Sequence, residues 1–339
     1  MSHRPALSQV ARGVRSFVTA ALVLVQPVIS ALLLVPQPAH ADVASGDVVF
    51  TQAHYPGGTY TIMKRSADGT ETPLAGGAGA AAIATEPQQP DVSHDGSRIV
   101  FDDPRPCLED TSQHRNVLIM INSDGSGETP LTAPNCLTNE YNADLNPKWS
   151  PDGTQIAFSH QHNITTLPGE FSSRIYKIDP GTGAETTVTT TDNEYDAPSW
   201  SPADGNGSHR IVYDSIDPAT GGFQLYIVNA DGTNSHLLAG SNSGYGDLYP
   251  VWSHDGNRIY FVSSGGLFGN YWYYESTDGF TTTTNVTRHQ ISSDAVNPLP
   301  EYDLSADDSS LVFVQGDRFD GYLGCRQLWS MIIVGISLT

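Results

Sequence analysis

Basic residues are scarce in this chain of 339 residues. It has 16 lysines and arginines against 37 aspartates and glutamates, which gives a formal net charge of −21 at pH 7. Binding to nucleic acid or to an anionic membrane surface needs clustered cations, so the composition argues against both kinds of partner. The acidity fits a soluble exported protein. It either serves solubility alone or attracts a cationic partner or a divalent metal.

Cysteines and catalytic signature motifs are also few. The sequence contains no G-x-S-x-G, no H-E-x-x-H and no phosphate-binding loop, so the hydrolases and metalloproteases that carry these motifs are not indicated. Cys107, Cys136 and Cys325 are the only cysteines. In an oxidising compartment we predict a disulfide between Cys107 and Cys136, which leaves Cys325 unpaired.

Long apolar runs are absent except near the N-terminus. Three arginines precede an apolar stretch over about 17–35, and an A-x-A sequence follows at 39–41. This order predicts a signal peptide over 1–41, with cleavage after Ala41, although an uncleaved membrane anchor has a similar pattern. No other stretch is long enough to span a bilayer. The expected mature chain, 42–339, has 13 basic and 37 acidic residues and a net charge of −24.

One turn phrase recurs along the mature chain. It is "PDVSHDGSRIVF" at 90–101, "NPKWSPDGTQIAF" at 146–158, "APSWSPADGNGSHRIVY" at 197–213, "YPVWSHDGNRIYF" at 249–261 and "EYDLSADDSSLVF" at 301–313. The marker serines (Ser93, Ser150, Ser201, Ser253 and Ser305) are 57, 51, 52 and 52 residues apart. Such a regular period indicates an internal structural repeat.

Each period has room for four short strands. An alternating strand follows the turn phrase, then a variable loop, a second strand ending in Asp-Gly or a similar turn, and a short last strand such as "TPLT" or "HLLA". This pattern is typical of a β-propeller blade. We predict an all-β, six-bladed β-propeller over 42–339, whose first blade lacks its innermost strand. The ring closes through the terminal "VGISLT", or the first blade has three strands.

The phrase P-x-W-S-P-D-G, followed by I-A-F and later by I-Y-x-I-D or L-Y-I-V-N-A-D-G, resembles the repeat of the TolB-like, WD-repeat-like β-propeller family. The resemblance covers essentially the whole mature chain. It implies a propeller scaffold, and the family's best-known member is a periplasmic protein of the cell envelope. We expect the repeated phrase to be structural. Trp149, Trp200 and Trp252 should pack between neighbouring blades, and His94 and His254 should be exposed turn residues.

Variable loops on one face of the predicted propeller are the expected functional surface, because long loops on a rigid scaffold commonly carry binding. The segments entering the innermost strands repeat an acidic and aromatic phrase, as in "NEYNADLNP" and "DNEYDAP". They should place an acidic and aromatic ring at the mouth of the central channel, formed by Asp144, Asp196, Asp247, Tyr141, Tyr195 and Tyr245. These carboxylates either accept backbone bonds in their own turns, or hold Ca²⁺ or a basic group of a partner.

The pair His160 and His162 supports an alternative function. Both lie at a strand end on the same expected face, and they are a weak candidate for metal ligation. Oligogalacturonate lyases resemble this repeat and use metal and histidines, so a metal-dependent polysaccharide lyase or hydrolase is the alternative. The preferred interpretation is a secreted or periplasmic, monomeric, non-enzymatic module that binds a protein or a cell-wall polysaccharide. It requires no cofactor, Ca²⁺ being the possible one.

Overall fold

The structure is a computed structural model. Over the residues that it describes, the regular elements are all β-strands. The described residues are 47–54, 59–76, 88–107, 113–134, 142–163, 171–191, 193, 195–217, 219–238, 246–264, 269–282, 285–291, 298–305, 307–315 and 327–332. Among them, no helix is long and apolar enough to cross a membrane. The predicted signal peptide at 1–41 lies outside this part of the chain.

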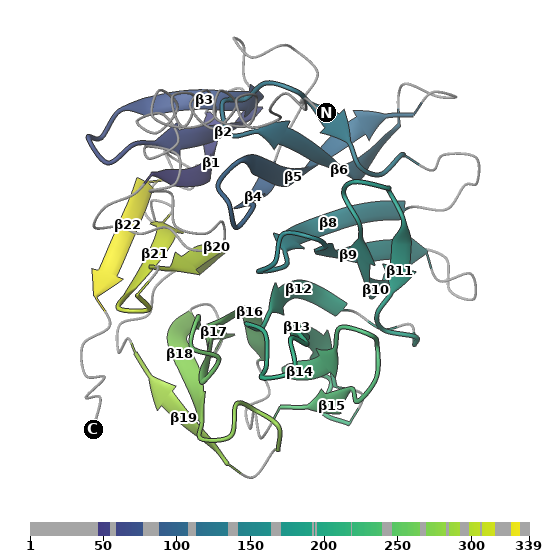
Figure 1. Cartoon of the computed structure of the whole chain (residues 1–339), viewed down its shortest axis with the longest axis vertical. Helices are drawn as coiled ribbons and strands as arrows, with labels where there is room; N and C mark the ends of the chain where they lie inside the picture. The colour runs from purple at the N-terminus through teal and green to yellow at the C-terminus, as the bar shows by residue number, and fades with distance from the viewer. Residues whose placement is uncertain are drawn as a thin grey trace, which may run out of the picture.

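The strands form antiparallel sheets that follow one another along the sequence, and Figure 1 shows them placed around a common axis. The first sheet contains β1 (Val48–His54), β2 (Thr59–Arg65) and β3 (Glu71–Gly76). The second contains β4 (Gln88–Val92), β5 (Arg98–Pro106), β6 (His114–Asn122) and β7 (Thr129–Pro130). The third contains β8 (Asn142–Trp149), β9 (Ile156–Asn163), β10 (Phe171–Ile178) and β11 (Glu185–Thr187).

The remaining sheets repeat this order. The fourth contains β12 (Tyr195–Trp200), β13 (Arg210–Ile216), β14 (Phe223–Asn229) and β15 (His236–Leu237). The fifth contains β16 (Asp247–Trp252), β17 (Arg258–Ser264), β18 (Gly269–Ser276) and β19 (Val286–Gln290). The sixth contains β20 (Pro298–Leu304), β21 (Ser310–Gln315) and β22 (Gln327–Ile332). The predicted all-β class is confirmed, and the described residues of the first sheet form three strands. "VGISLT" lies outside the described residues, so its predicted role in closing the ring stays a prediction.

The core lies between the sheets rather than within one layer. Val100 and Leu118 of the second sheet pack against Trp149 and Phe158 of the third, and four similar clusters join the other successive sheets. Alternate side chains of a strand point to opposite faces. In the second strands the apolar segment that follows the turn, such as 156–158, is buried on both faces, which explains why it is continuous. Trp149, Trp200 and Trp252 are at most 8% exposed and lie in these clusters, as predicted.

The marker serines hold the turns that join first and second strands. In the third sheet, the Ser150 hydroxyl donates to Asp152 Oδ1 at 2.6 Å and accepts the backbone N–H of Gln155 at 3.0 Å. Ser93, Ser253 and Ser305 donate to an aspartate two residues later in the same way. The repeated phrase is therefore structural. His94 is exposed, as predicted, but half-buried His254 contacts Asp308 of the sixth sheet through Nδ1 at 2.6 Å.

Each sheet has a turn end and a loop end. The turn end carries the connections between first and second strands, at 93–97, 150–155, 201–209, 253–257 and 305–309. The loop end carries the connections between second and third strands, which include 107–113, 164–170, 217–222, 265–268 and 316–326. Much of the loop end, which is the predicted functional face, lies outside the described residues.

Candidate functional site

A bulge near the loop end shapes four of the innermost strands. In each, two residues lie opposite one residue of the second strand, and the first of the two precedes a proline. These first residues have left-handed backbone angles, with φ of 51° at Gln89, 55° at Asn146, 43° at Ala197 and 55° at Tyr249. The bulge turns a backbone N–H out of its own ladder, so that N–H must find another acceptor.

Buried aspartates of the preceding sheets accept two of these amides. Asp102 Oδ2 lies 3.4 Å from the backbone nitrogen of Asn146, and Asp214 Oδ2 lies 2.8 Å from that of Tyr249. Asp102 also accepts a bond from the Asn116 side chain at 2.9 Å. Burial raises the pKa of Asp102 to about 8 and that of Asp214 well above its usual value, and the Asp196 charge adds to both effects. These carboxylates join neighbouring sheets.

A second row of polar groups joins the sheets closer to the turn end. Asp91 accepts the backbone N–H of Trp149 at 2.7 Å and the Lys148 ammonium at 3.2 Å. Ser199 makes the matching bond two sheets later, to the backbone N–H of Trp252 at 3.1 Å. Burial raises the pKa of Asp303, at the same position of the sixth sheet, to about 8, although the Lys148 charge opposes the rise. The row adds rigidity to the scaffold.

The structure brings Asp144 and His160 together. Neither the acidic phrase around Asp144 nor the histidine pair indicated this contact by itself. They face each other across β8 and β9, and Asp144 Oδ1 lies 2.7 Å from His160 Nδ1. The His162 ring stacks on that of His160 with 6.0 Å between centroids. The ring of Tyr176, on the neighbouring strand β10, has its centroid 5.1 Å from that of His160. The His160 side chain is 30% exposed, so this pair reaches solvent near the loop end.

Asp247 occupies the position that matches Asp144 but has different partners. Its carboxylate pairs with Arg288 at 2.9 Å and accepts the Tyr274 hydroxyl at 2.9 Å. Burial raises its pKa, while the Arg288 charge works in the opposite direction. Asp247 is fully buried and ties β16 to β18 and β19, so its described partners are all within its own sheet.

Asp196 is one residue out of register with Asp144 and Asp247. Asp196 lies opposite Asp214, whereas Asp144 and Asp247 lie opposite residues one step further along the second strand, His160 and Ser263. Because side chains alternate between faces, Asp196 points to the other face of its sheet. There it contacts the Asn146 side-chain amide of the third sheet. The residue that matches Asp144 in register is Tyr195.

Several predicted residues cannot be placed. Tyr141, Tyr245, Cys136 and Cys325 lie outside the described residues, as does the side chain of Tyr195. Cys107 is buried and disulfide-bonded, and the identity of its partner stays a prediction. Within the described part of the chain, no three histidine, cysteine, aspartate or glutamate side chains gather in a way that could hold a metal ion.

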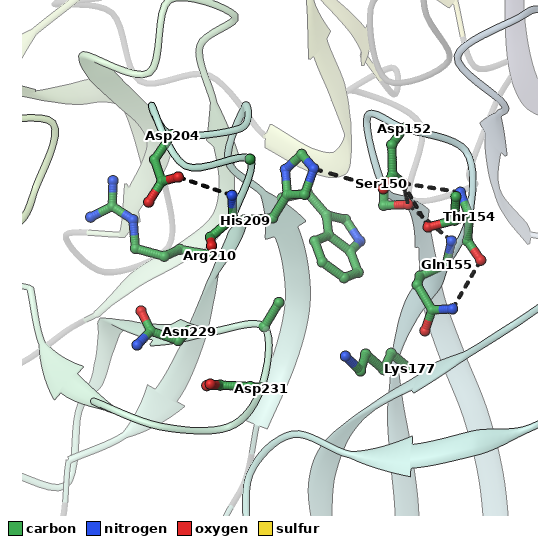
Figure 2. A pocket seen from close by; sticks show the side chains of 14 residues that line it. Ser150, Asp152, Thr154, Gln155, Lys177, Asp204, His209, Arg210, Asn229 and Asp231 are labelled. Atoms are coloured by element: carbon green, nitrogen blue, oxygen red, sulfur yellow. Dashed lines mark hydrogen bonds and ion pairs between the residues drawn. The ribbon is translucent and has the colours of Figure 1, made fainter.

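A pocket lies at the turn end between the third and fourth sheets, on the face that the sequence did not single out. Its volume is about 450 Å³. Figure 2 shows His209 between the turn that carries Asp204 and the turn that carries Asp152, with Lys177 and Asp231 below. The sequence does contain a feature that could have indicated this pocket. The repeated phrase at 197–213 has a longer turn than its counterparts, and the extra residues form one wall of the pocket.

Comparison with known proteins places the fold. No family model matches the chain. An uncharacterized protein of Agrobacterium fabrum is 31% identical over 115 residues, which are 34% of this chain and 34% of that protein. The match thus spans about a third of the relative's length.

Among solved structures, TolB from Acinetobacter baumannii superposes with a TM-score of 0.59 at 15% identity, covering 87% of this chain and 63% of that one. A putative TolB from Agrobacterium tumefaciens gives 0.52 at 21% identity, covering 78% and 88%. An oligogalacturonate lyase in complex with manganese gives 0.55 at 14% identity, covering 88% and 74%. The chain therefore has a TolB-like β-propeller fold.

Proposed function

We propose that the protein is an exported TolB-like propeller that binds a protein or a cell-wall polysaccharide without transforming it. One observation carries the proposal. The buried carboxylates of Asp91, Asp102 and Asp214 accept backbone amides of neighbouring sheets. Carboxylates held in this way build a rigid support for loops, which suits recognition. Export is supported by the signal-peptide pattern of 1–41.

The proposal takes the sheets as six blades of one closed ring. It is supported by their order along the chain and by the packing of each sheet on the next. For a mature chain of about 298 residues, a compact ring should have a radius of gyration of about 19 Å. Small-angle scattering of the purified protein measures this quantity, and a clearly larger value would indicate an open array.

The partner would contact the loop end around Asp144, His160 and Asp196. His160 and Asp196 are partly accessible, whereas Asp144 is buried and reaches this surface through its contact with His160. Two of the three residues carry a carboxylate, so a basic group of the partner is the complementary feature. Ca²⁺ could act at this surface through its oxygen ligands, although the proposal does not require it. Asp247 is left out of the contact surface because it is buried against Arg288.

Affinity capture tests the proposal. The tagged, exported protein is incubated with envelope and secreted fractions of its source, with Ca²⁺ and with a chelator. A double Asp144→Asn, Asp196→Asn variant is compared with a double Asp68→Asn, Asp124→Asn variant, which removes the same charge from exposed turns. We expect one partner to be enriched, and only the first variant to lose it. Equal capture by both variants would rule out this surface.

A polysaccharide lyase or hydrolase is the second candidate, favoured by the contact between Asp144 and His160. A carboxylate at 2.7 Å fixes the orientation of an imidazole, as general bases and metal ligands require. The described residues do not supply a complete metal site, so a metal-dependent mechanism does not fit them. Cleavage of polygalacturonate and other polysaccharides, tested with His160→Ala and His162→Ala, decides this case. Activity lost in both variants would replace the binding proposal.

A further inference from the structure

The pocket at the turn end has a fixed aromatic base. The indole N–H of buried Trp200 donates to the backbone oxygen of Lys148 at 3.0 Å. The His209 ring stands edge-on to that indole, with 6.0 Å between centroids and 90° between planes. His209 Nδ1 is in turn 2.9 Å from the backbone oxygen of Ser201. Both rings are therefore held in place before any ligand arrives.

The walls of the pocket carry many neutral hydrogen-bonding groups. Thr154 and Gln155 come from the turn of the third sheet, whereas Ser208 and Asn229 come from the fourth. Figure 2 shows Gln155 and Asn229 on opposite sides of the pocket. Hydroxyl and amide side chains supply both donors and acceptors, so the two walls can bond a ligand that presents both kinds of group.

Three carboxylates lie on the rim of the pocket. Asp152 Oδ2 is 3.9 Å from His209 Nε2, whereas the other two keep an acceptor available. Asp204 and Asp231 each use Oδ1 for bonds within their own turns, and their other oxygens make no hydrogen bond among the described residues. Those turn bonds lower the pKa of both aspartates. Burial raises the pKa of Asp152, but bonds from Ser150 and Thr154 outweigh this effect and leave it lowered. All three are therefore ionised at neutral pH.

Cations share the same lining. Lys177 stands across the pocket from Asp204, and Arg210 adds a second positive charge. The Arg210 guanidinium also donates to the Phe280 backbone oxygen at 3.0 Å, which fixes its position. A ligand with several charges of one sign would meet repulsion from one part of this lining. A neutral ligand with hydroxyl groups can bond to both the carboxylates and the cations.

We infer that this pocket binds a neutral saccharide unit. A sugar ring offers C–H groups to an aromatic base and hydroxyls to polar walls, which matches an aromatic base with convergent polar groups. The site goes beyond the proposed function, because it lies at the opposite end of the sheets from the loop-end surface. The capture experiment does not test this inference, because the residues changed in that experiment do not line the pocket.

Titration calorimetry of the full exported protein tests the inference. The probes are three neutral trisaccharides, of glucose in α and β linkage and of N-acetylglucosamine, with trilysine and trigalacturonate as charged alternatives. Binding of at least one neutral trisaccharide at millimolar concentration or below is expected. Asn229→Ala and Gln155→Ala should each weaken it by about tenfold, because each removes a hydrogen bond to the ligand.

The chain offers a matched control for the variants. Asn122 occupies the same turn position in the second sheet and donates to Ser126 at 3.0 Å, as Asn229 donates to Thr233 at 2.9 Å. Asn122 does not line the pocket. Asn122→Ala should therefore match Asn229→Ala in thermal stability and match the unchanged protein in binding. Absence of neutral-sugar binding, binding of the charged probes alone, or equal binding by the two variants would overturn the inference.

Discussion

Replacing Asp102 with asparagine should flatten the pH dependence of folding stability between pH 5 and 7. Burial raises the pKa of Asp102 in the folded protein to about 8 from an ordinary value of 3.8. Between those values the folded state retains a proton that the unfolded state has released. The stabilisation is therefore fully present below about pH 4, near the ordinary pKa of an aspartate, and it is lost as the pH rises to about 8.

The size of the effect follows from proton linkage. One proton bound by the folded state alone changes the free energy of unfolding by about 1.4 kcal/mol per pH unit, or about 3 kcal/mol from pH 5 to 7. Burial also raises the pKa of Asp303 to about 8 and that of Asp214 well above its usual value, so Asp102 is one of several groups that contribute to the decline in the unchanged protein. Asp102→Asn should remove the contribution of Asp102 to this pH dependence. It retains an oxygen for the Asn146 amide, so the loss at pH 5 should be only about 1 kcal/mol.

Urea unfolding followed by tryptophan fluorescence at pH 5, 6 and 7 measures these slopes. Asp68→Asn is the control, because Asp68 is exposed and accepts the Thr70 backbone N–H in a turn that asparagine can also form. Hydrogen bonds from Thr70 lower the pKa of Asp68, so it is ionised in both states across this range. If Asp102→Asn has the same slope as the unchanged protein, the carboxyl ionises normally and the reasoning from burial fails.

Three further predictions concern the scaffold. Asp91→Ala should lower the free energy of unfolding by about 3 kcal/mol, and Asp91→Ser should recover part of it because Ser199 makes the matching bond; urea unfolding compares them. Ala197→Gly should leave the free energy of unfolding unchanged or raise it by about 1 kcal/mol, because a φ of 43° is unfavourable for a residue with a side chain. A decrease of more than about 1 kcal/mol in the same assay would contradict the bulge geometry. Reduction should cost about 2–4 kcal/mol, and peptide mapping should identify Cys136 as the partner of Cys107, with any other partner refuting the pairing.

The fold was largely predictable because its signals are local and repeated. Each period repeats the turn phrase and the apolar alternation of the following strand, and the structure forms a hairpin at each. Buried tryptophans at a constant offset from the turn, such as Trp149 and Trp252, pack between sheets for the same reason. Repetition provides several independent readings of one structural unit, so an error in one repeat is corrected by the others.

The candidate site was less predictable because its contacts join different repeats. The partner of Asp102 is 44 residues away and that of Asp91 is 58 residues away. The local sequence does not show which residue of the neighbouring repeat such an aspartate contacts. The pocket shows the same limit, since its walls come from turns of two different sheets and their approach depends on sheet packing.

The misalignment of Asp196 has a specific physical cause. Alignment by the acidic and aromatic phrase pairs Asp196 with Asp144, but the spacing to the following proline differs, with two residues from Asp196 to Pro198 and three from Asp144 to Pro147. The bulge is fixed by the proline, because the left-handed residue directly precedes it in both strands. Register is therefore set from the proline backwards, and a one-residue difference moves a side chain to the opposite face. Moving Asp196 to that face brings it beside Asp102 and Asp214, whose pKa values its charge raises. Two nearly identical sequences therefore place their aspartates differently. Asp196 makes a contact between sheets, whereas Asp144 pairs with His160 near the loop end.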